Sequence, residues 1–106
     1  MSLKNSNTTA DYIEWDTMVD LVHRLYNDGM YRYSLLVGCG SFFGLRVSDL
    51  RALRWCQLLD GHRLSLIEKK TGKRRDIKIN AAFQQHIRNC YAALNIAHPD
   101  EYCFIN

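Results

Sequence analysis

The elements of the chain can be defined outward from one stretch, Gly44-Leu45-Arg46-Val47-Ser48-Asp49-Leu50-Arg51-Ala52-Leu53-Arg54-Trp55. Gly44 can end a preceding helix. Ser48 and Asp49 suit the first turn of a following helix, because their side-chain oxygens can accept hydrogen bonds from unpaired backbone amides. We therefore predict a short helix over residues 47–56. Its two large apolar side chains are expected in the core, namely Leu50 and Trp55.

Two further helices are predicted upstream. The first shows apolar side chains at the spacing of one helix face, namely Trp15, Met18, Val19, Val22, Leu25 and Tyr26. Gly29 follows where a glycine commonly ends a helix. Residues 30–43 are apolar nearly all round, which is typical of a helix buried at the centre of a domain.

Downstream, the period of the pattern changes from helical to extended. Residues 63–67 and 76–79 alternate like strands, and Thr71 and Gly72 between them favour a hairpin turn. Asn80 can cap a last helix whose apolar face carries Phe83, Ile87, Cys90, Tyr91 and Leu94. The predicted fold class is α+β and mainly helical, with three helices, a β-hairpin and then a helix.

The composition predicts one small domain. The chain has 106 residues with a formal net charge of +3, which only weakly favours an anionic partner. Residues 1–10 are interpreted as a disordered polar tail or a remnant of cloning. Residues 69–75 place five cations in seven positions, and at this level a solvated turn and an anion-binding turn both remain open.

The cysteine pattern and the hydropathy predict a cytoplasmic protein without a metal. The four cysteines stand singly, with no closely spaced pair that could hold zinc: Cys39, Cys56, Cys90 and Cys103. Free thiols indicate a reducing compartment, and Cys39 and Cys90 are expected to be small core residues. The apolar stretch over residues 35–45 is too short and too broken to span a membrane, and no signal peptide is recognisable.

The opening stretch also carries a resemblance to a known family. Residues 44–55 resemble the first conserved box of the tyrosine recombinases (phage integrases), G-L-R-x-S-[ED]-L-x-x-L-x-W, at every patterned position. Lys70 lies 24 residues after Arg46 in a K-T-G turn that resembles the lysine-bearing hairpin of the family. The resemblance covers residues 12–106, so residues 11–106 are interpreted as part of a recombinase catalytic domain, its N-terminal half.

The resemblance implies DNA strand exchange without a metal or nucleotide cofactor. In this family a tyrosine attacks a DNA phosphate, forms a 3′-phosphotyrosyl link and releases a 5′-hydroxyl. Arg46 matches the first catalytic arginine. An arginine suits this role because its permanently charged guanidinium can donate hydrogen bonds to two phosphate oxygens at once. Lys70 matches the lysine that protonates the leaving oxygen as a general acid, although Lys69 is adjacent and the choice between them stays open.

Supporting and DNA-binding roles are also implied. Asp49 matches the acidic position of the first box, where it either orients Arg46 or braces the start of the helix. Non-specific contacts with DNA phosphates are expected from Lys69, Lys73, Arg74, Arg75 and Arg51, with Arg54 as an alternative to Arg51.

Two parts of the family pattern do not occur within these 106 residues. No histidine begins a His-x-x-Arg box, and none of the six tyrosines follows such a box. The chain is therefore predicted to be inactive alone. Its expected partners are double-stranded DNA and the other recombinase subunits of a synaptic assembly. The alternatives are a non-catalytic DNA-binding module derived from a recombinase, a protein-interaction domain with a basic hairpin, and a relative of the type IB topoisomerases.

Overall fold

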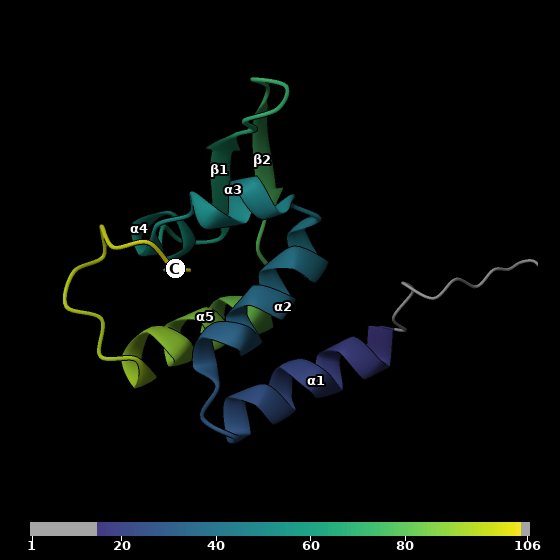
Figure 1. Cartoon of the computed structure of the whole chain (residues 1–106), viewed down its shortest axis with the longest axis vertical. Helices are drawn as coiled ribbons and strands as arrows, with labels where there is room; N and C mark the ends of the chain where they lie inside the picture. Colours follow the sequence, from purple (N-terminus) through teal and green to yellow (C-terminus); the bar gives the residue numbers. More distant parts are fainter. Residues whose placement is uncertain (1–14, 105–106) are drawn as a thin grey trace, which may run out of the picture.

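The computed structural model describes residues 15–104. The predicted tail over residues 1–10 and the last two residues lie outside this range. In chain order the elements are α1 (Trp15–Asn27), α2 (Tyr31–Phe43), α3 (Val47–Arg51), α4 (Trp55–Leu58), β1 (Arg63–Ile67), β2 (Arg74–Lys78) and α5 (Ala81–Ala93). The α+β class and the order of helices, hairpin and last helix are as predicted. Helices α1, α2 and α5 form a helical body from which the hairpin projects (Figure 1).

The predicted helix over residues 47–56 is instead two short helices. Between α3 and α4, Arg54 is extended, with φ −110° and ψ 153°, and forms an isolated antiparallel bridge with Tyr102. The carbonyl of Leu53 accepts a hydrogen bond from the amide of Cys103 at 2.9 Å, and the amide of Trp55 donates to the carbonyl of Glu101 at 3.1 Å. The segment near the C-terminus thus satisfies backbone groups that a continuous helix would have paired internally.

The helix ends follow the predicted local signals. Gly29 and Gly44 both have positive φ, 81° and 63°, where glycine has no steric penalty. The amide of Gly44 donates to the carbonyl of Gly40 at 3.1 Å and closes the end of α2. At the start of α5, Oδ1 of Asn80 accepts a hydrogen bond from the amide of Phe83 at 2.8 Å, as the cap prediction requires.

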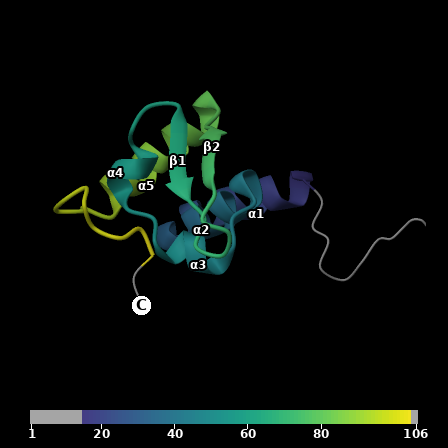
Figure 2. The same cartoon turned by 90° about the horizontal axis from the view of Figure 1, so that it is seen from above.

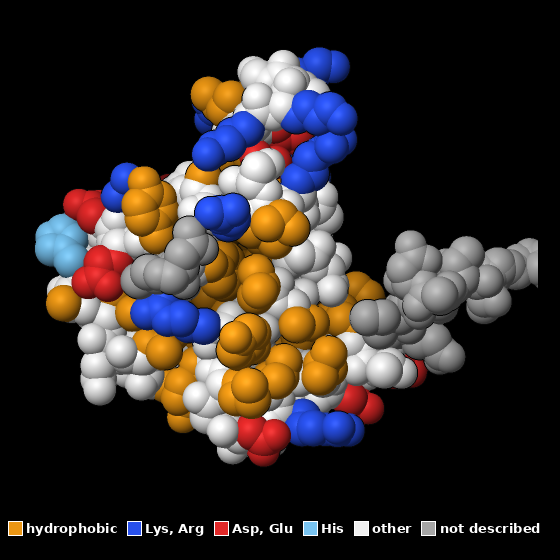
Figure 3. Space-filling view, viewed as in Figure 1, with side chains coloured by type: hydrophobic (Ala, Val, Ile, Leu, Met, Phe, Trp, Pro, Cys, Tyr) orange, Lys and Arg blue, Asp and Glu red, His pale blue; other side chains and the backbone are white. Residues whose placement is uncertain are grey.

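Helix α2 is central but not wholly buried. It packs against α1, α3 and α5, and Leu35 and Cys39 on its inner face are fully buried. Its outer stripe stays open, because the side chain of Tyr33 is 60% exposed. Apolar side chains accordingly gather over α2 in the space-filling view (Figure 3). The expectation of a helix buried on all sides therefore holds for one face of α2 only.

The core joins α2, α3, α4 and α5 to the first strand, and half-buried Tyr26 of α1 packs against it. Its fully buried large residues are Leu35, Leu53, Trp55, Leu58, Leu64, Ile79 and Ile87. The expected burial of Leu50 and Trp55 is confirmed, and so is that of Cys39 and Cys90. All four cysteines are free, and burial raises the pKa of the Cys90 thiol to about 12.

The hairpin has two chemically different faces. Its antiparallel register pairs Arg63 with Lys78, Ser65 with Asp76 and Ile67 with Arg74 on one face, and these six exposed residues are called the outward face. The inward face carries Leu64, Leu66, Arg75 and Ile77, all buried or half-buried. Strand β2 begins two residues earlier than predicted, at Arg74. Residues 69–72 form the turn, where Gly72 has φ 70°.

None of the helices within residues 15–104 is long and apolar enough to cross a membrane.

Candidate functional site

Arg46 lies at the junction between α2 and α3, as predicted. Its backbone is extended, with φ −74° and ψ 158°, and its carbonyl accepts hydrogen bonds from the amides of Asp49 at 3.0 Å and Leu50 at 2.9 Å. Leu45 before it is buried, whereas the Arg46 side chain is exposed. The backbone is thus fixed on both sides of a guanidinium that remains accessible to an anion.

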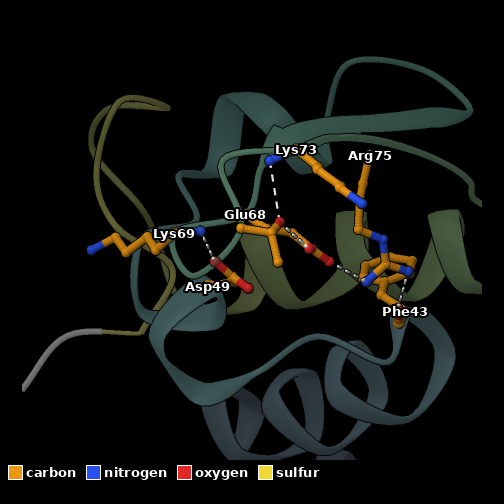
Figure 4. A network of polar contacts seen from close by, with 7 residues as sticks. Phe43, Asp49, Glu68, Lys69, Lys73 and Arg75 are labelled. Atoms are coloured by element: carbon orange, nitrogen blue, oxygen red, sulfur yellow. Dashed lines mark hydrogen bonds and ion pairs between the residues drawn. The ribbon is translucent and has the colours of Figure 1, made fainter.

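Asp49 connects this junction to the hairpin. Its side chain is 5% exposed, and Oδ1 accepts a hydrogen bond from the backbone amide of Lys69 at 3.0 Å. The Lys69 side chain extends away from that carboxylate (Figure 4). The sequence predicted that Asp49 orients Arg46 or braces the start of α3. In the structure the Asp49 side chain accepts its hydrogen bond from the backbone of Lys69 in the hairpin turn. Asp49 therefore braces the turn that carries the two candidate lysines.

Arg75 makes a second connection between the hairpin and the same junction. Its Nη2 donates to the carbonyl of Phe43 at 3.1 Å, and its Nη1 donates to Oε2 of Glu68 at 3.2 Å (Figure 4). Phe43 is the last residue of α2, so the guanidinium caps a carbonyl at a helix C-terminus, where a cation is favourable. Arg75 was predicted to bind DNA. The structure places Arg75 on the inward face, where its guanidinium group donates to two partners within the chain.

Glu68 is a member of this network that the sequence did not single out. Oε1 of Glu68 accepts a hydrogen bond from Oγ1 of Thr71 at 2.8 Å, and its backbone amide and carbonyl bond to Lys73 and Gly72 across the turn. The pKa of Glu68 is lowered, first by the hydrogen bond from Thr71, then by Arg75 and by the charge of Arg46, against an opposing effect of partial desolvation. Glu68 therefore stays ionised between the turn and the predicted catalytic arginine.

The other predicted cations lie around the turn and along the outward face. Lys69, Lys70 and Lys73 are exposed, and the amide of Lys73 donates to Oγ1 of Thr71 at 3.2 Å. Arg74 is on the outward face, 3.5 Å from Oδ1 of Asp76. Arg51 is exposed in the last turn of α3. In both cartoon views α3 lies next to the hairpin, so these cations share one end of the molecule (Figures 1 and 2).

Arg54, the alternative to Arg51, is engaged within the chain. Its guanidinium donates to the carbonyl of Asp100 at 2.7 Å and to the hydroxyl of Tyr102 at 2.8 Å. It also lies 4.2 Å from the centre of the Tyr102 ring. These contacts hold the segment near the C-terminus against α4, which favours Arg51 over Arg54 as a residue free to meet an external anion.

A separate cavity of about 240 Å³ lies among α1, α2 and α5 and contains none of the predicted site residues. His86 lines it, and Nε2 of His86 is 2.9 Å from the hydroxyl oxygen of buried Ser34. That hydroxyl donates to the carbonyl of Val22 at 2.6 Å, so Nε2 of His86 is the donor to Ser34. Desolvation, with a smaller effect of His23, lowers the pKa of His86. His86 therefore joins three helices as a neutral ring.

Two hydrogen bonds connect the lysine-bearing hairpin to the segment around Arg46. Arg46 lies between Phe43 and Asp49 in sequence, and these two residues hold Arg75 and Lys69 of the hairpin. The backbones of Arg46 and Lys69 are held in this way, while their charged side chains are exposed. Such cations can bind an anion with negative charge spread over several oxygens, as on a phosphate. Within residues 15–104 no cluster of histidine, cysteine or acidic side chains could hold a metal ion.

Comparison of the chain with family models, with curated proteins and with solved structures found no match.

Replacing Asp49 with alanine should loosen the hairpin turn. The amide of Lys69 loses the buried side-chain oxygen that accepts its hydrogen bond, which should cost about 1–3 kcal/mol. We expect hydrogen exchange at the Lys69 amide to become roughly tenfold to a hundredfold faster. Asp49→Asn keeps an acceptor oxygen and should have a smaller effect. Asp60→Ala, at an exposed aspartate, is the control. Unchanged exchange at Lys69 in Asp49→Ala would show that the turn is held by other contacts.

Proposed function

We propose that this chain is part of a tyrosine site-specific recombinase, a DNA integrase that cuts and rejoins DNA through a phosphotyrosine intermediate. It supplies the first catalytic arginine, Arg46, and the hairpin lysine, Lys70. The nucleophilic tyrosine and the second box would come from residues outside these 106, so the chain alone is expected to be inactive. The proposal includes the cytoplasm as the location and other recombinase subunits as partners.

The observation that carries the proposal is the hydrogen bond from the Lys69 amide to Asp49. The two residues that touch, Asp49 and Lys69, are 20 positions apart in the sequence. A chance resemblance of the two motifs would give no reason for them to touch. Here the acidic position of the first box directly contacts the turn of the lysine-bearing hairpin. The contact supports a common role of the two motifs around one phosphate.

The chemistry assigned to the two residues follows from their charge and placement. The Arg46 guanidinium would donate to two non-bridging oxygens of the scissile phosphate and stabilise the charge that develops there. The Lys70 ammonium, on an exposed turn, would give a proton to the 5′ oxygen as it leaves. Glu68 and Asp49 would hold the turn and the arginine in position. No metal or nucleotide cofactor is required by this scheme.

The chain should bind duplex DNA weakly, and the affinity should fall steeply with salt. Five exposed cations at the site, Arg46, Lys69, Lys70, Lys73 and Arg51, each displace about 0.9 counterion per phosphate contact. We expect these five cations together to contribute about −4.5 to the slope of log K against log salt. The measurement is fluorescence anisotropy with a labelled duplex of about 30 base pairs, at salt concentrations between about 50 and 200 mM.

The matched control replaces Lys69, Lys70 and Lys73 together with glutamine, which should make the slope shallower by about 2.7. If the wild-type chain does not bind, or binds without dependence on salt, the DNA-binding function is wrong. The basic hairpin would then belong to a protein-interaction domain.

A further inference from the structure

The outward face of the hairpin carries two cations outside the predicted DNA-binding set, Arg63 and Lys78, beside Arg74, which belongs to that set. Its six residues contain three cations, Arg63, Arg74 and Lys78, against one carboxylate, Asp76. All four side chains are exposed. Lys and Arg side chains gather around the hairpin in the space-filling view (Figure 3). This surplus of positive charge lies on the face opposite Arg75 and Glu68.

The pairing of Arg63 with Lys78 is unfavourable for the isolated chain. The two cations are directly opposite each other in the ladder, where side chains on one face are close neighbours, and like charges in such a pair destabilise a sheet. Within residues 15–104 neither of them forms an ion pair. An anion that binds between them would remove the repulsion.

Asp76 cannot neutralise the whole face. Its Oδ1 accepts a hydrogen bond from Oγ of Ser65 and lies 3.5 Å from Nε of Arg74. The pKa of Asp76 is lowered, mainly by Ser65 and then by the charges of Arg74 and Arg63. Asp76 thus pairs with Arg74 alone, and Arg63 and Lys78 are left without an ion-pair partner among the described residues.

The shape of this face fits an extended polyanion. Arg74 and Lys78 are four residues apart on one strand, about 13 Å, so the face spans several phosphates of a DNA strand. A shallow cleft of about 400 Å³ lies beside it, lined by Gln57, Ser65, Leu66, Ile67 and Arg74. Ile67 is 67% exposed and offers an apolar contact to a deoxyribose.

We infer that the outward face is a second DNA-backbone contact, made by Arg63, Arg74 and Lys78. The inference rests on the proposed function. A two-stranded ribbon that enters a groove of duplex DNA has one backbone on each side. In this arrangement the turn and Arg46 contact the DNA backbone that is cut. The outward face contacts the other DNA backbone, on the opposite side of the groove. A single strand offers no such second backbone.

The test compares variants of equal charge in the full chain. The face variant is Arg63→Gln with Lys78→Gln, the tip variant is Lys69→Gln with Lys70→Gln, and the control is Arg24→Gln with Arg88→Gln on α1 and α5. The face variant should reduce the salt slope on duplex DNA by about 1.8 and leave binding to a single strand of equal length unchanged. The tip variant should weaken both, and the control neither.

The face variant also separates lost binding from lost folding. Removing the like-charge pair should leave the melting temperature unchanged or higher, so weaker duplex binding would not reflect unfolding. Duplex binding equal to wild type in the face variant, with the tip variant impaired, would overturn the inference and leave the proposed function standing. No binding by the wild type would overturn the proposed function itself.

Two other outcomes would also overturn the inference. Equal losses on duplex and single strand would assign the face to the same backbone as the turn. If polyglutamate binds the wild type and loses affinity in the face variant as much as duplex DNA does, the surface would be suited to acidic proteins rather than to a second DNA strand.

Discussion

Arg46→Ala should strongly slow formation of the covalent protein–DNA adduct in a longer protein that contains this chain and the nucleophilic tyrosine. The loss of one preorganised donor to a developing oxyanion typically lowers the rate by about 10²–10³. The measurement is adduct formation on a suicide DNA substrate, which traps the phosphotyrosyl link. The Arg46 side chain is exposed, and the hydrogen bonds of this residue with α3 are made by its backbone carbonyl, so the variant should fold normally.

Lys70→Ala in the same assay should slow cleavage without removing it. A positioned general acid contributes about 10²–10⁴ to the rate. A substrate whose leaving 5′ oxygen is replaced by sulfur needs no proton, so it should restore cleavage in Lys70→Ala but not in Arg46→Ala. Lys69→Ala is the matched comparison, and it should change cleavage little if Lys70 is the acid. Rescue of Lys69→Ala by the sulfur substrate would transfer the role to Lys69.

The absence of a covalent adduct would distinguish between the two candidate functions. If no adduct forms on any substrate while the chain still binds DNA in a salt-dependent manner, the non-catalytic DNA-binding reading is the better one. If Arg46→Lys restores activity fully, the bidentate role is wrong, because lysine keeps the charge but cannot fork onto two oxygens.

The sequence was sufficient where local chemistry determines the structure. Gly44 ends α2 because a positive φ suits glycine, and that end places Arg46 at the junction. The alternating pattern and the Thr71-Gly72 turn gave the hairpin, and the side chain of Asn80 gave the start of α5. Each of these signals acts within a few residues, so no knowledge of the tertiary fold was needed.

The remaining features depend on contacts between distant segments. The break between α3 and α4 comes from pairing with residues 99–103, more than 40 positions away. The direction of Arg75 depends on the register of β1 and β2, because a shift by one residue would have turned it outward with Arg74. The role of Glu68 could have been suspected from its place beside the cation run, since a carboxylate there opposes the cations. Its hydrogen-bond partners, Thr71 and Arg75, could not have been predicted from the sequence.

These distant contacts also explain how a small hairpin can hold the two candidate lysines in a defined place. A two-stranded hairpin alone is marginally stable in water. Here Leu64 is fully buried, Asp49 holds the turn, and Arg75 holds the inward face to the end of α2. The hairpin therefore projects from the body while its position relative to Arg46 is fixed from two sides.

Trp55→Ala should unfold most of the domain, even though Trp55 belongs to the same family-like box as Arg46. The side chain is fully buried, and its ring centre lies 5.3 Å from that of Tyr91 on α5. Truncating a buried tryptophan costs about 3–5 kcal/mol, and a domain of this size is expected to lie near the lower end of typical stabilities. Chemical denaturation followed by circular dichroism would measure the loss.

Trp55→Phe is the control that separates packing from hydrogen bonding at this position. The indole nitrogen of Trp55 is buried and has no hydrogen-bond partner among the described residues. Removing that donor should therefore cost nothing, and the loss of ring volume should cost about 1 kcal/mol. A large loss in Trp55→Phe would show that the indole N–H has a partner, such as a buried water molecule. A small loss in Trp55→Ala would contradict its place in the core. Arg46→Ala should fold normally and cleave slowly, whereas Trp55→Ala should unfold, and this contrast separates the two kinds of residue that one box contains.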